Sequence, residues 1–300
     1  MANNTRQIRR QIKSIKNTAK ITKAMEMISA VKMQRTQTQA LSARPYADSA
    51  WEILTMLSQG VKKSDHPFFE QREIRSVGIV VLSSNRGLCG GLNSSVAKEV
   101  LSVYDRIATT QRHASVKLVT MGKRARDTLA RMNKEIAADF PKPDVAAGSS
   151  SVVGLAQFVL SAFLNKEFDH VVIVYPKFLS ILRQEAAVKQ LLPLREQDVL
   201  EANGAKHEME QKLNTSYLFE PSTEEVLRSL LERLMEVQVY QALLETNASE
   251  HAARMVAMKN ATENALEIVG DLTLFSNRVR QAAITQEVSE ITSGRLALEG

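Results

Sequence analysis

The sequence predicts an α/β protein in which a central domain with a mostly parallel sheet is flanked by two long helices that pair as an antiparallel coiled coil. Two observations predict this fold. The middle of the chain alternates short apolar, β-branched runs with helical segments, and both ends carry apolar residues at a spacing near 3.5. The chain has 300 residues, of which 44% are hydrophobic and 24% charged, so it can form a globular core.

The first 44 residues are predicted to form one helix, because they contain neither Gly nor Pro and space their apolar residues by three or four. The apolar stripe begins with Ile8, Ile12, Ile15 and Ala19 and continues, one step round the helix, with Ile21, Met25 and Ile28. Pro45 is expected to end or kink this helix, whose pattern resumes towards Leu57. Residues 60–67 are interpreted as a linker.

This N-terminal segment is strongly basic. Residues 1–44 contain ten Lys or Arg and one acid, Glu26, which gives a net charge of +9, whereas the whole chain has +6. Such asymmetry is compatible with an organelle transit peptide, with binding to nucleic acid or anionic lipid, with pairing to an acidic element of the same chain, or with a solvated helix face.

The middle of the chain is predicted to form βαβ units with helices on both faces of the sheet. Strands are expected at residues 76–82, 116–120, 135–140, 170–175 and 184–192, and helices at residues 93–111, 123–132 and 150–164. Asn93 or Ser94 could cap the first of these helices. Residues 195–215 are polar and are interpreted as a loop or hairpin.

The last part of the chain is predicted to be one helix over residues 222–293, opened by Ser222 as a capping residue. It contains no proline, and Gly270 is not expected to end it. Apolar residues dominate an imperfect heptad seam from Leu227 to Val279. Such a helix would be about 110 Å long, too long to be buried in a compact domain. The segment is net acidic, with eleven Asp or Glu against six Lys or Arg, which favours pairing with the basic N-terminal helix.

No motif in the sequence predicts an active site. Ser83–Gly91 (SSNRGLCGG) lies between a strand and a helix, where nucleotide-binding folds hold phosphate, but it has neither GxGxxG nor GxxxxGK[ST]. We therefore interpret it as a tight turn that needs positive φ. Cys89 is the single cysteine and has no His–acid pair nearby in the sequence, and His251 falls on the helical seam. The absence of HExxH and of an apolar run of ~18 residues argues against a His-built metal site and a membrane span.

Four segments resemble the γ subunit of rotary F-type ATP synthases. They are IKNTAKITKAMEMISAVKM (15–33), SSNRGLCGGLN (83–93), ASEHAARMVAMKNATENA (248–265) and RQAAITQEVSEITSG (280–294). The motifs are long and lie in the family's order across nearly the whole chain. The resemblance implies a coiled coil of the terminal helices plus a Rossmann-like α/β domain, and it weakens the transit-peptide interpretation. The cysteine pair of the redox-regulated chloroplast relatives is missing, which indicates a bacterial, non-photosynthetic type.

By this resemblance, the chain is expected to be the central rotor shaft that couples proton flow through a membrane c-ring to the catalytic β subunits. The implied partners are three α and three β subunits, the ε subunit and the c-ring, without nucleic acid or a small-molecule substrate. The implied chain is not an enzyme, carries no cofactor or metal, and is peripheral on the cytoplasmic face of the bacterial membrane. The alternatives are a nucleotide-binding α/β enzyme and a basic coiled coil that binds nucleic acid.

The resemblance also implies two sets of interface residues. The residues expected to face the β subunits are Lys23, Met25, Arg254, Arg280, Gln281 and Thr285. Those expected to face the c-ring or ε are Arg86, Leu88, Cys89, Gly90, Gly91, Tyr217 and Glu220.

The predicted division of the chain is residues 1–60 for the first helix, 70–215 for the α/β domain and 216–300 for the second helix. If the two helices pair from a common base at equal rise, the numbers of facing residues sum to about 280. Met25 would then lie level with Met255, and Ile8 with Leu272. Beyond about Asn277 the second helix would have no partner in its own chain.

Overall fold

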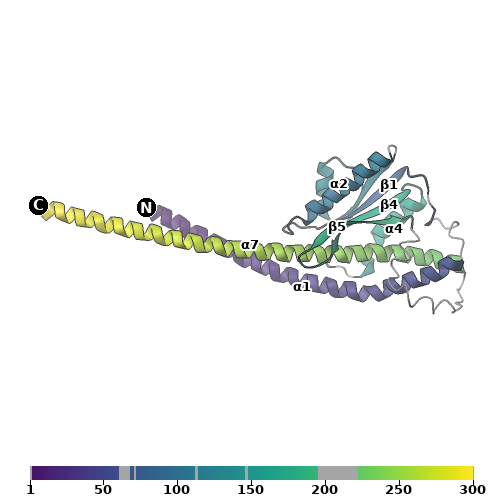
Figure 1. Cartoon of the computed structure of the whole chain (residues 1–300), viewed down its shortest axis with the longest axis horizontal. Helices are drawn as coiled ribbons and strands as arrows, with labels where there is room; N and C mark the ends of the chain where they lie inside the picture. Colours follow the sequence, from purple (N-terminus) through teal and green to yellow (C-terminus); the bar gives the residue numbers. More distant parts are fainter. Residues whose placement is uncertain are drawn as a thin grey trace. The chain divides into compact units, whose positions relative to one another are not determined.

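The computed structural model describes residues 2–60, 68–70, 72–111, 114–145, 148–194 and 222–299. Two long helices, α1 (Ala2–Gly60) and α7 (Thr223–Glu299), enclose an α/β segment in the sequence (Figure 1). The chain divides into two compact units. We call residues 2–29 with 254–299 the paired-helix unit, and residues 30–253 the α/β unit.

A five-stranded sheet forms the centre of the α/β unit, with strand order β3-β2-β1-β4-β5. The strands are β1 (Ser76–Leu82), β2 (Ser115–Met121), β3 (Ile136–Phe140), β4 (His170–Phe178) and β5 (Gln184–Leu192). The first four run parallel, and β5 runs antiparallel to β4. The five residues between β4 and β5 are too few for a crossover, so that connection must be a hairpin.

Helices cover both faces of the sheet, as predicted. Alternate residues of β1 point to opposite faces: Val77, Ile79 and Val81 pack under α2 (Leu92–Thr110) and α3 (Lys123–Arg131). Val80 and Leu82 belong to a larger core with α4 (Val153–Leu164) and with residues 231–244 of α7. A short 3-10 turn, Ser149–Ser151, precedes α4. The apolar face of α7 is therefore part of the domain core.

The sequence left one feature of the helices open and was wrong about another. Pro45 was expected to end or kink the first helix, and α1 does not end there but continues to Gly60, in agreement with the predicted resumption of the pattern. Pro45 and Leu41, whose carbonyl loses its i+4 donor, both lie on the exposed face, where water can satisfy that carbonyl. Helix α2 begins at Leu92 with Gly91 as its N-cap and no side-chain cap. Asn93 instead accepts hydrogen bonds from the backbone N–H and hydroxyl of Ser84.

Ser222 does cap α7, because its hydroxyl accepts a hydrogen bond from the N–H of Glu225 at 3.2 Å. Gly270 does not interrupt the helix, as predicted, and the helix runs to Glu299, beyond the predicted end at residue 293. Of the predicted linker at residues 60–67, Gly60 is the last residue of α1, and residues 61–67 lie outside the described residues, as does the predicted loop at residues 195–215.

The seam of the paired-helix unit keeps a strict four-three spacing on α1, so the predicted step round the helix was wrong. After Ile8, Ile12, Ile15 and Ala19, the buried positions continue with Thr22 and Ser29. Ile21 and Ile28, which were predicted to continue the stripe, are 61% and 57% exposed. From Thr22 onward, small polar residues occupy buried positions of the seam. A pattern made of apolar residues alone therefore does not show where the seam continues.

The hydroxyls of Thr22 and Thr262 lie 2.7 Å apart and fix the register of the two helices. Their numbers sum to 284, close to the predicted value of about 280. Ala283 is the last described residue of α7 with a partly buried side chain, and residues 284–295 are all exposed. Within this unit, the C-terminal helix extends past the N-terminal one (Figure 1). The predicted unpaired tip is therefore present.

Candidate functional site

Two features of the structure are candidates for a functional role. They are the exposed surfaces of the long helices and a set of polar contacts between α7 and the sheet of the α/β unit. Among the described residues, no group of three or more His, Cys, Asp or Glu could hold a metal ion. No helix in the described part of the chain is long and apolar enough to cross a membrane. The described residues instead form surfaces that other proteins can contact, and polar contacts that connect α7 to the α/β domain.

The turn after β1 has the positive φ that the sequence predicted. Gly90 has φ 58°, and Leu88 has φ 63°. Leu88 is 61% exposed, and Arg86, Gly90 and Gly91 are also exposed. A left-handed, exposed leucine is unfavourable for a monomer and is typical of a binding surface. Cys89 differs from its neighbours because it is buried, with the amide of Asn93 3.1 Å from its Sγ.

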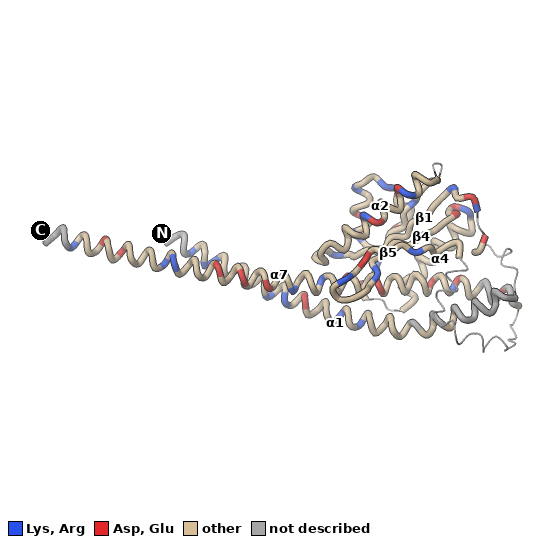
Figure 2. The backbone as a smooth tube through the Cα atoms, viewed as in Figure 1, with Lys and Arg blue, Asp and Glu red and all other residues tan. Residues whose placement is uncertain are grey.

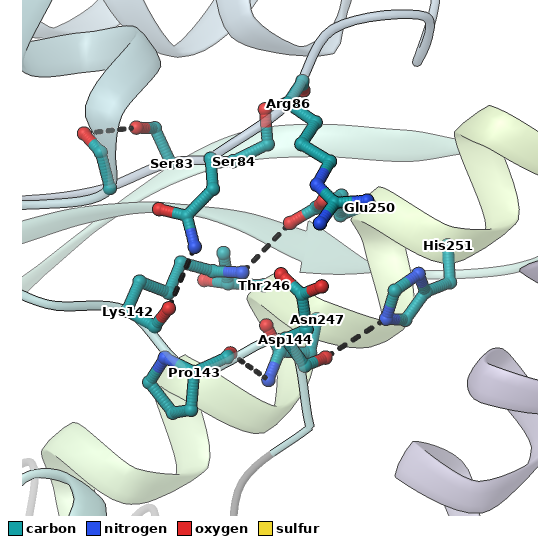
Figure 3. Close-up of polar contacts among 12 residues, drawn as sticks. Ser83, Ser84, Arg86, Lys142, Pro143, Asp144, Thr246, Asn247, Glu250 and His251 are labelled. Atoms are coloured by element: carbon teal, nitrogen blue, oxygen red, sulfur yellow. Dashed lines mark hydrogen bonds and ion pairs between the residues drawn. The ribbon is translucent and has the colours of Figure 1, made fainter.

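Lys142 and Glu250 form a buried ion pair between the segment after β3 and α7. The Nζ of Lys142 lies 2.7 Å from Oε2 of Glu250, and the two side chains are 0% and 3% exposed (Figure 3). The carbonyl of Lys142 accepts a hydrogen bond of 2.7 Å from the side-chain amide of Asn85. Arg86 points towards Glu250 from the same loop (Figure 3). The hydrogen bond from Asn85 holds the backbone of Lys142 in place, and the buried ion pair connects that backbone to α7.

The next two residues of the segment also contact α7. The carbonyl of Pro143 accepts from the amide of Asn247 at 3.4 Å, and the carbonyl of Asp144 lies 3.1 Å from Nε2 of His251. Because a carbonyl only accepts, this ring nitrogen carries the proton. His251 is therefore a satisfied, buried histidine.

The carboxylate of Asp144 connects the segment to α1, because it pairs with Lys32 at 3.4 Å. Partial burial alone would raise the pKa of Asp144, but the charge and hydrogen bond of Lys32, with the charges of Arg86 and Lys142, lower it below its usual value. Asp144 is thus held ionised at neutral pH.

One further contact holds the same turn of α7. The hydroxyl of Ser249 donates a hydrogen bond of 2.9 Å to the carbonyl of Pro176 in β4, and Ser249 is fully buried. We name this set of contacts the polar collar. Its members are Lys142, Pro143, Asp144 and Pro176 on the sheet side, and Asn247, Ser249, Glu250 and His251 on α7. Apart from the histidine on the helical seam, no sequence pattern predicted the polar collar, because its members come from three distant segments.

The residues predicted to face β subunits fall into two bands of the paired-helix unit. Lys23 is exposed and pairs with Glu26 of its own helix at 3.0 Å, Met25 is partly buried, and Arg254 is 8% exposed. The register places Met25 level with residue 259, about one turn from Arg254. These three residues therefore form one band.

The second band consists of Arg280, Gln281 and Thr285, which are exposed near the end of the paired region. It lies about 40 Å along α7 from the first band. The hydroxyl of Thr285 donates to the carbonyl of Gln281, so it supports the helix from within.

A set of exposed apolar residues lies on the paired-helix unit. Its members are Ile21, Met27 and Ile28 on α1 and Leu266, Leu274, Phe275, Ile284, Val288 and Ile291 on α7. Ile284, Val288 and Ile291 belong to the predicted unpaired tip, where exposure was expected, whereas the other members were not predicted. Basic residues also follow the first half of α1 (Figure 2). Large exposed apolar side chains in such number indicate a surface that is covered by other proteins. The register, once known, is the signal that separates them from the seam.

Of the two predicted parts of the base, the structure describes only the loop Arg86–Gly91. Tyr217 and Glu220 lie outside the described residues, shortly before α7 begins at Thr223. Arg86–Gly91 lies beside the polar collar, level with residue 250 of α7, which is about 40 Å along the helix from Thr223.

Comparison with known proteins identifies relatives over the full length. Residues 4–298 match a protein family described as ATP synthase. An ATP synthase gamma chain of Chloroflexus aurantiacus is 42% identical over 299 residues, covering 98% of both chains, and one of Cupriavidus necator is 39% identical over 98% of this chain and 99% of its own length.

Solved structures give the same result for the fold. A central-stalk chain of the Tetrahymena thermophila mitochondrial ATP synthase matches with a TM-score of 0.61 and 26% identity, covering 80% of this chain and 99% of its own. A rotor chain of the Euglena gracilis enzyme matches with a TM-score of 0.64 and 19% identity, covering 95% of this chain and 100% of its own.

Proposed function

Because this chain belongs to the family of ATP synthase γ chains, we propose that it acts as the central rotor stalk, which couples proton flow through the membrane c-ring to the conformational cycle of the catalytic β subunits. The observation that carries this function is the paired-helix unit, whose C-terminal tip is unpaired and whose flanks expose large apolar side chains. Such a surface has a purpose only inside a cavity formed by other subunits.

The coupling follows from asymmetry. Two paired helices of different sequence present a different surface in each direction, so a turning shaft contacts each of three β subunits differently at any moment. Each contact favours one conformation of a catalytic subunit over another, which is what coupling between sites requires. The chain is the non-catalytic partner in this cycle, since the catalytic sites lie in the β subunits. This role accounts for the observed surfaces better than nucleotide binding or nucleic-acid binding.

We assign the β-facing surface to the two bands described above, Lys23, Met25 and Arg254 in the first and Arg280, Gln281 and Thr285 in the second. Arg254, which is 8% exposed, would contribute to the first band mainly by supporting its neighbours. Tyr217 and Glu220 are assigned to contact with the c-ring, and Arg86–Gly91 to contact with ε. Within the last group, Arg86, Leu88, Gly90 and Gly91 supply the exposed surface, and buried Cys89 supports the turn. The complex is expected at the cytoplasmic face of a bacterial membrane, with this chain as a peripheral subunit.

Purification at native abundance tests the proposed function. The chain should co-elute with α and β subunits and, from membranes, with the c-ring. Elution without either partner would contradict the proposal.

A charge placed in the first band tests the β-facing assignment. Met25→Lys should lower ATP synthesis and proton pumping more than it lowers the yield of assembled complex, because it adds a charge to the surface that is assigned to contact with an acidic loop of the β subunit. Lys98→Ala on exposed α2 is the control. Normal pumping and synthesis in the Met25→Lys complex would contradict the assignment.

A charge reversal tests the base assignment. Glu220→Lys should reduce the membrane-bound fraction of the complex and leave the ATPase activity of the released part intact. An unchanged membrane-bound fraction would count against it.

A further inference from the structure

We propose that the polar collar is the joint through which the α/β unit turns α7, so that Lys142 and Glu250 are positioning residues for torque transfer. This inference rests on the proposed rotor function. It concerns a step that the family assignment leaves open, namely how rotation of the α/β domain is passed to a helix that is only packed against it.

Apolar packing alone is a poor means of transmitting torque. The core between the sheet and residues 231–244 of α7 is held by non-directional contacts, which tolerate small rotations of a helix about its own axis. Hydrogen bonds and ion pairs are directional and fix that rotation. The polar collar lies directly after this apolar stretch and includes the last residues of α7 that belong to the α/β unit.

The hydrogen bonds and the ion pair of the polar collar contact α7 on nearly opposite sides of the helix. Residues of an α-helix are about 100° apart, so Glu250 and His251 lie within about 60° of Asn247 on either side, and Ser249 lies about 200° away. Asn247, Glu250 and His251 contact the segment 142–144, whereas Ser249 contacts β4. A helix held from two sides can neither roll nor tilt without breaking a contact.

The segment 142–144 also holds α1, because the carboxylate of Asp144 pairs with Lys32 while its carbonyl contacts His251. One short segment, fixed to the sheet edge by β3 and to the β1 loop by Asn85, thus connects both long helices to the domain. Both helices must therefore turn with the sheet.

The test measures the torsional stiffness of the rotor in the assembled complex. A bead is attached through Lys98→Cys on exposed α2, since Cys89 is buried, and the α and β subunits are fixed to a surface. During catalytic pauses the fixed α and β subunits hold the far part of the long helices still. The angular variance of the bead then reports the torsional stiffness between that part of the helices and the α/β unit. The double variant Lys142→Met/Glu250→Leu removes the ion pair and keeps the volume, a replacement that stability usually tolerates.

We expect the variance of the double variant to rise about twofold, because directional contacts are replaced by sliding ones. Arg183→Gln/Glu185→Gln, which removes an exposed ion pair of the same domain, should leave the variance unchanged. Ser249→Ala, a milder change that is expected to assemble even if the double variant does not, should raise the variance by a smaller amount.

The proposal that the polar collar transmits torque would be contradicted if the angular variance were unchanged in an assembled variant, whether the double variant or Ser249→Ala. The proposed rotor function would not be affected by that result. If the unmodified chain did not rotate on addition of ATP, the rotor function itself would fail, so the two failures are distinguishable.

Discussion

The polar collar contains one buried ion pair, and its energetics are asymmetric. Lys142 and Glu250 are 0% and 3% exposed, so their mutual attraction offsets part of the cost of burying two charges. Such pairs add little net stability over an apolar substitute, but the loss of one partner leaves a buried, uncompensated charge. The pair therefore specifies how α7 docks more than it stabilises the domain.

The first prediction is a double-mutant cycle at this pair. Lys142→Met alone and Glu250→Leu alone should each lower the free energy of unfolding by roughly 3–5 kcal/mol, whereas the double variant should lose far less. Urea unfolding of the isolated chain, followed by circular dichroism, measures all three. Additive losses would show that the two groups are not coupled.

Gly122 occupies a position that only glycine tolerates. Its φ is 121°, and a Cβ there would lie 2.3 Å from the carbonyl oxygen of Ser83. The hydroxyl of Ser83 accepts a hydrogen bond from the N–H of Ala125 and so caps α3 from the neighbouring strand. The turn after β2 is thus fitted closely against the turn after β1.

Two glycine substitutions should therefore have opposite signs. Gly122→Ala is expected to destabilise the α/β unit by roughly 2–4 kcal/mol, because it combines a clash with backbone strain. Gly270→Ala, in open space within α7, is expected to stabilise the paired helices by up to about 1 kcal/mol. Thermal unfolding of the two variants in parallel checks both values, and equal shifts would refute the argument.

At the scale of elements, the strands and helices of the α/β unit could be predicted because each is a local pattern. All five strands were located from the local sequence, and Ser222 was identified as a cap from its own sequence context. What the sequence left open or missed has non-local causes. Pro45 lies inside a helix because Ala43 and Ala50 on either side pack against the core, and the Thr22 seam is set by the opposite helix.

The candidate site was less predictable than the fold. Positions on the surface of the long helices were reached only through family motifs, and the polar collar was missed because residues 32, 142–144, 176 and 247–251 meet only in the folded chain. A sequence pattern has no signal for an ion pair between residues 108 positions apart.

The unpaired tip of α7 should be ordered only by its partners. Residues 284–295 are all exposed within the described part of the chain, and an isolated helix of about 15 residues is marginal in water. Hydrogen exchange should find the amides of residues 284–293 unprotected in the isolated chain and protected in the assembled complex. Residues 255–265, in the paired region, are the internal control.

Strong protection of the tip in the isolated monomer would contradict the register set by Thr22 and Thr262. It would require another segment of the chain to cover the end of α7.

For the whole molecule, the two units have different tasks. The α/β unit has a double-faced core and a polar collar that fixes the long helices to its sheet. The paired-helix unit has a narrow seam that mixes apolar residues with small polar ones, and many of its large apolar residues are exposed. The core and the polar contacts of the α/β unit make it rigid without a partner. The exposed apolar residues of the paired-helix unit indicate that other subunits surround it. A rotor needs both, a domain that receives torque and a shaft whose flanks act on its surroundings.

Direct observation of rotation tests the central claim. A bead on Lys98→Cys of the chain, in a complex fixed to a surface through its β subunits, should turn in one direction when ATP is added and pause at three angles in each turn. With ADP alone it should only fluctuate. A bead that stays at one angle while the same complexes hydrolyse ATP would contradict the account.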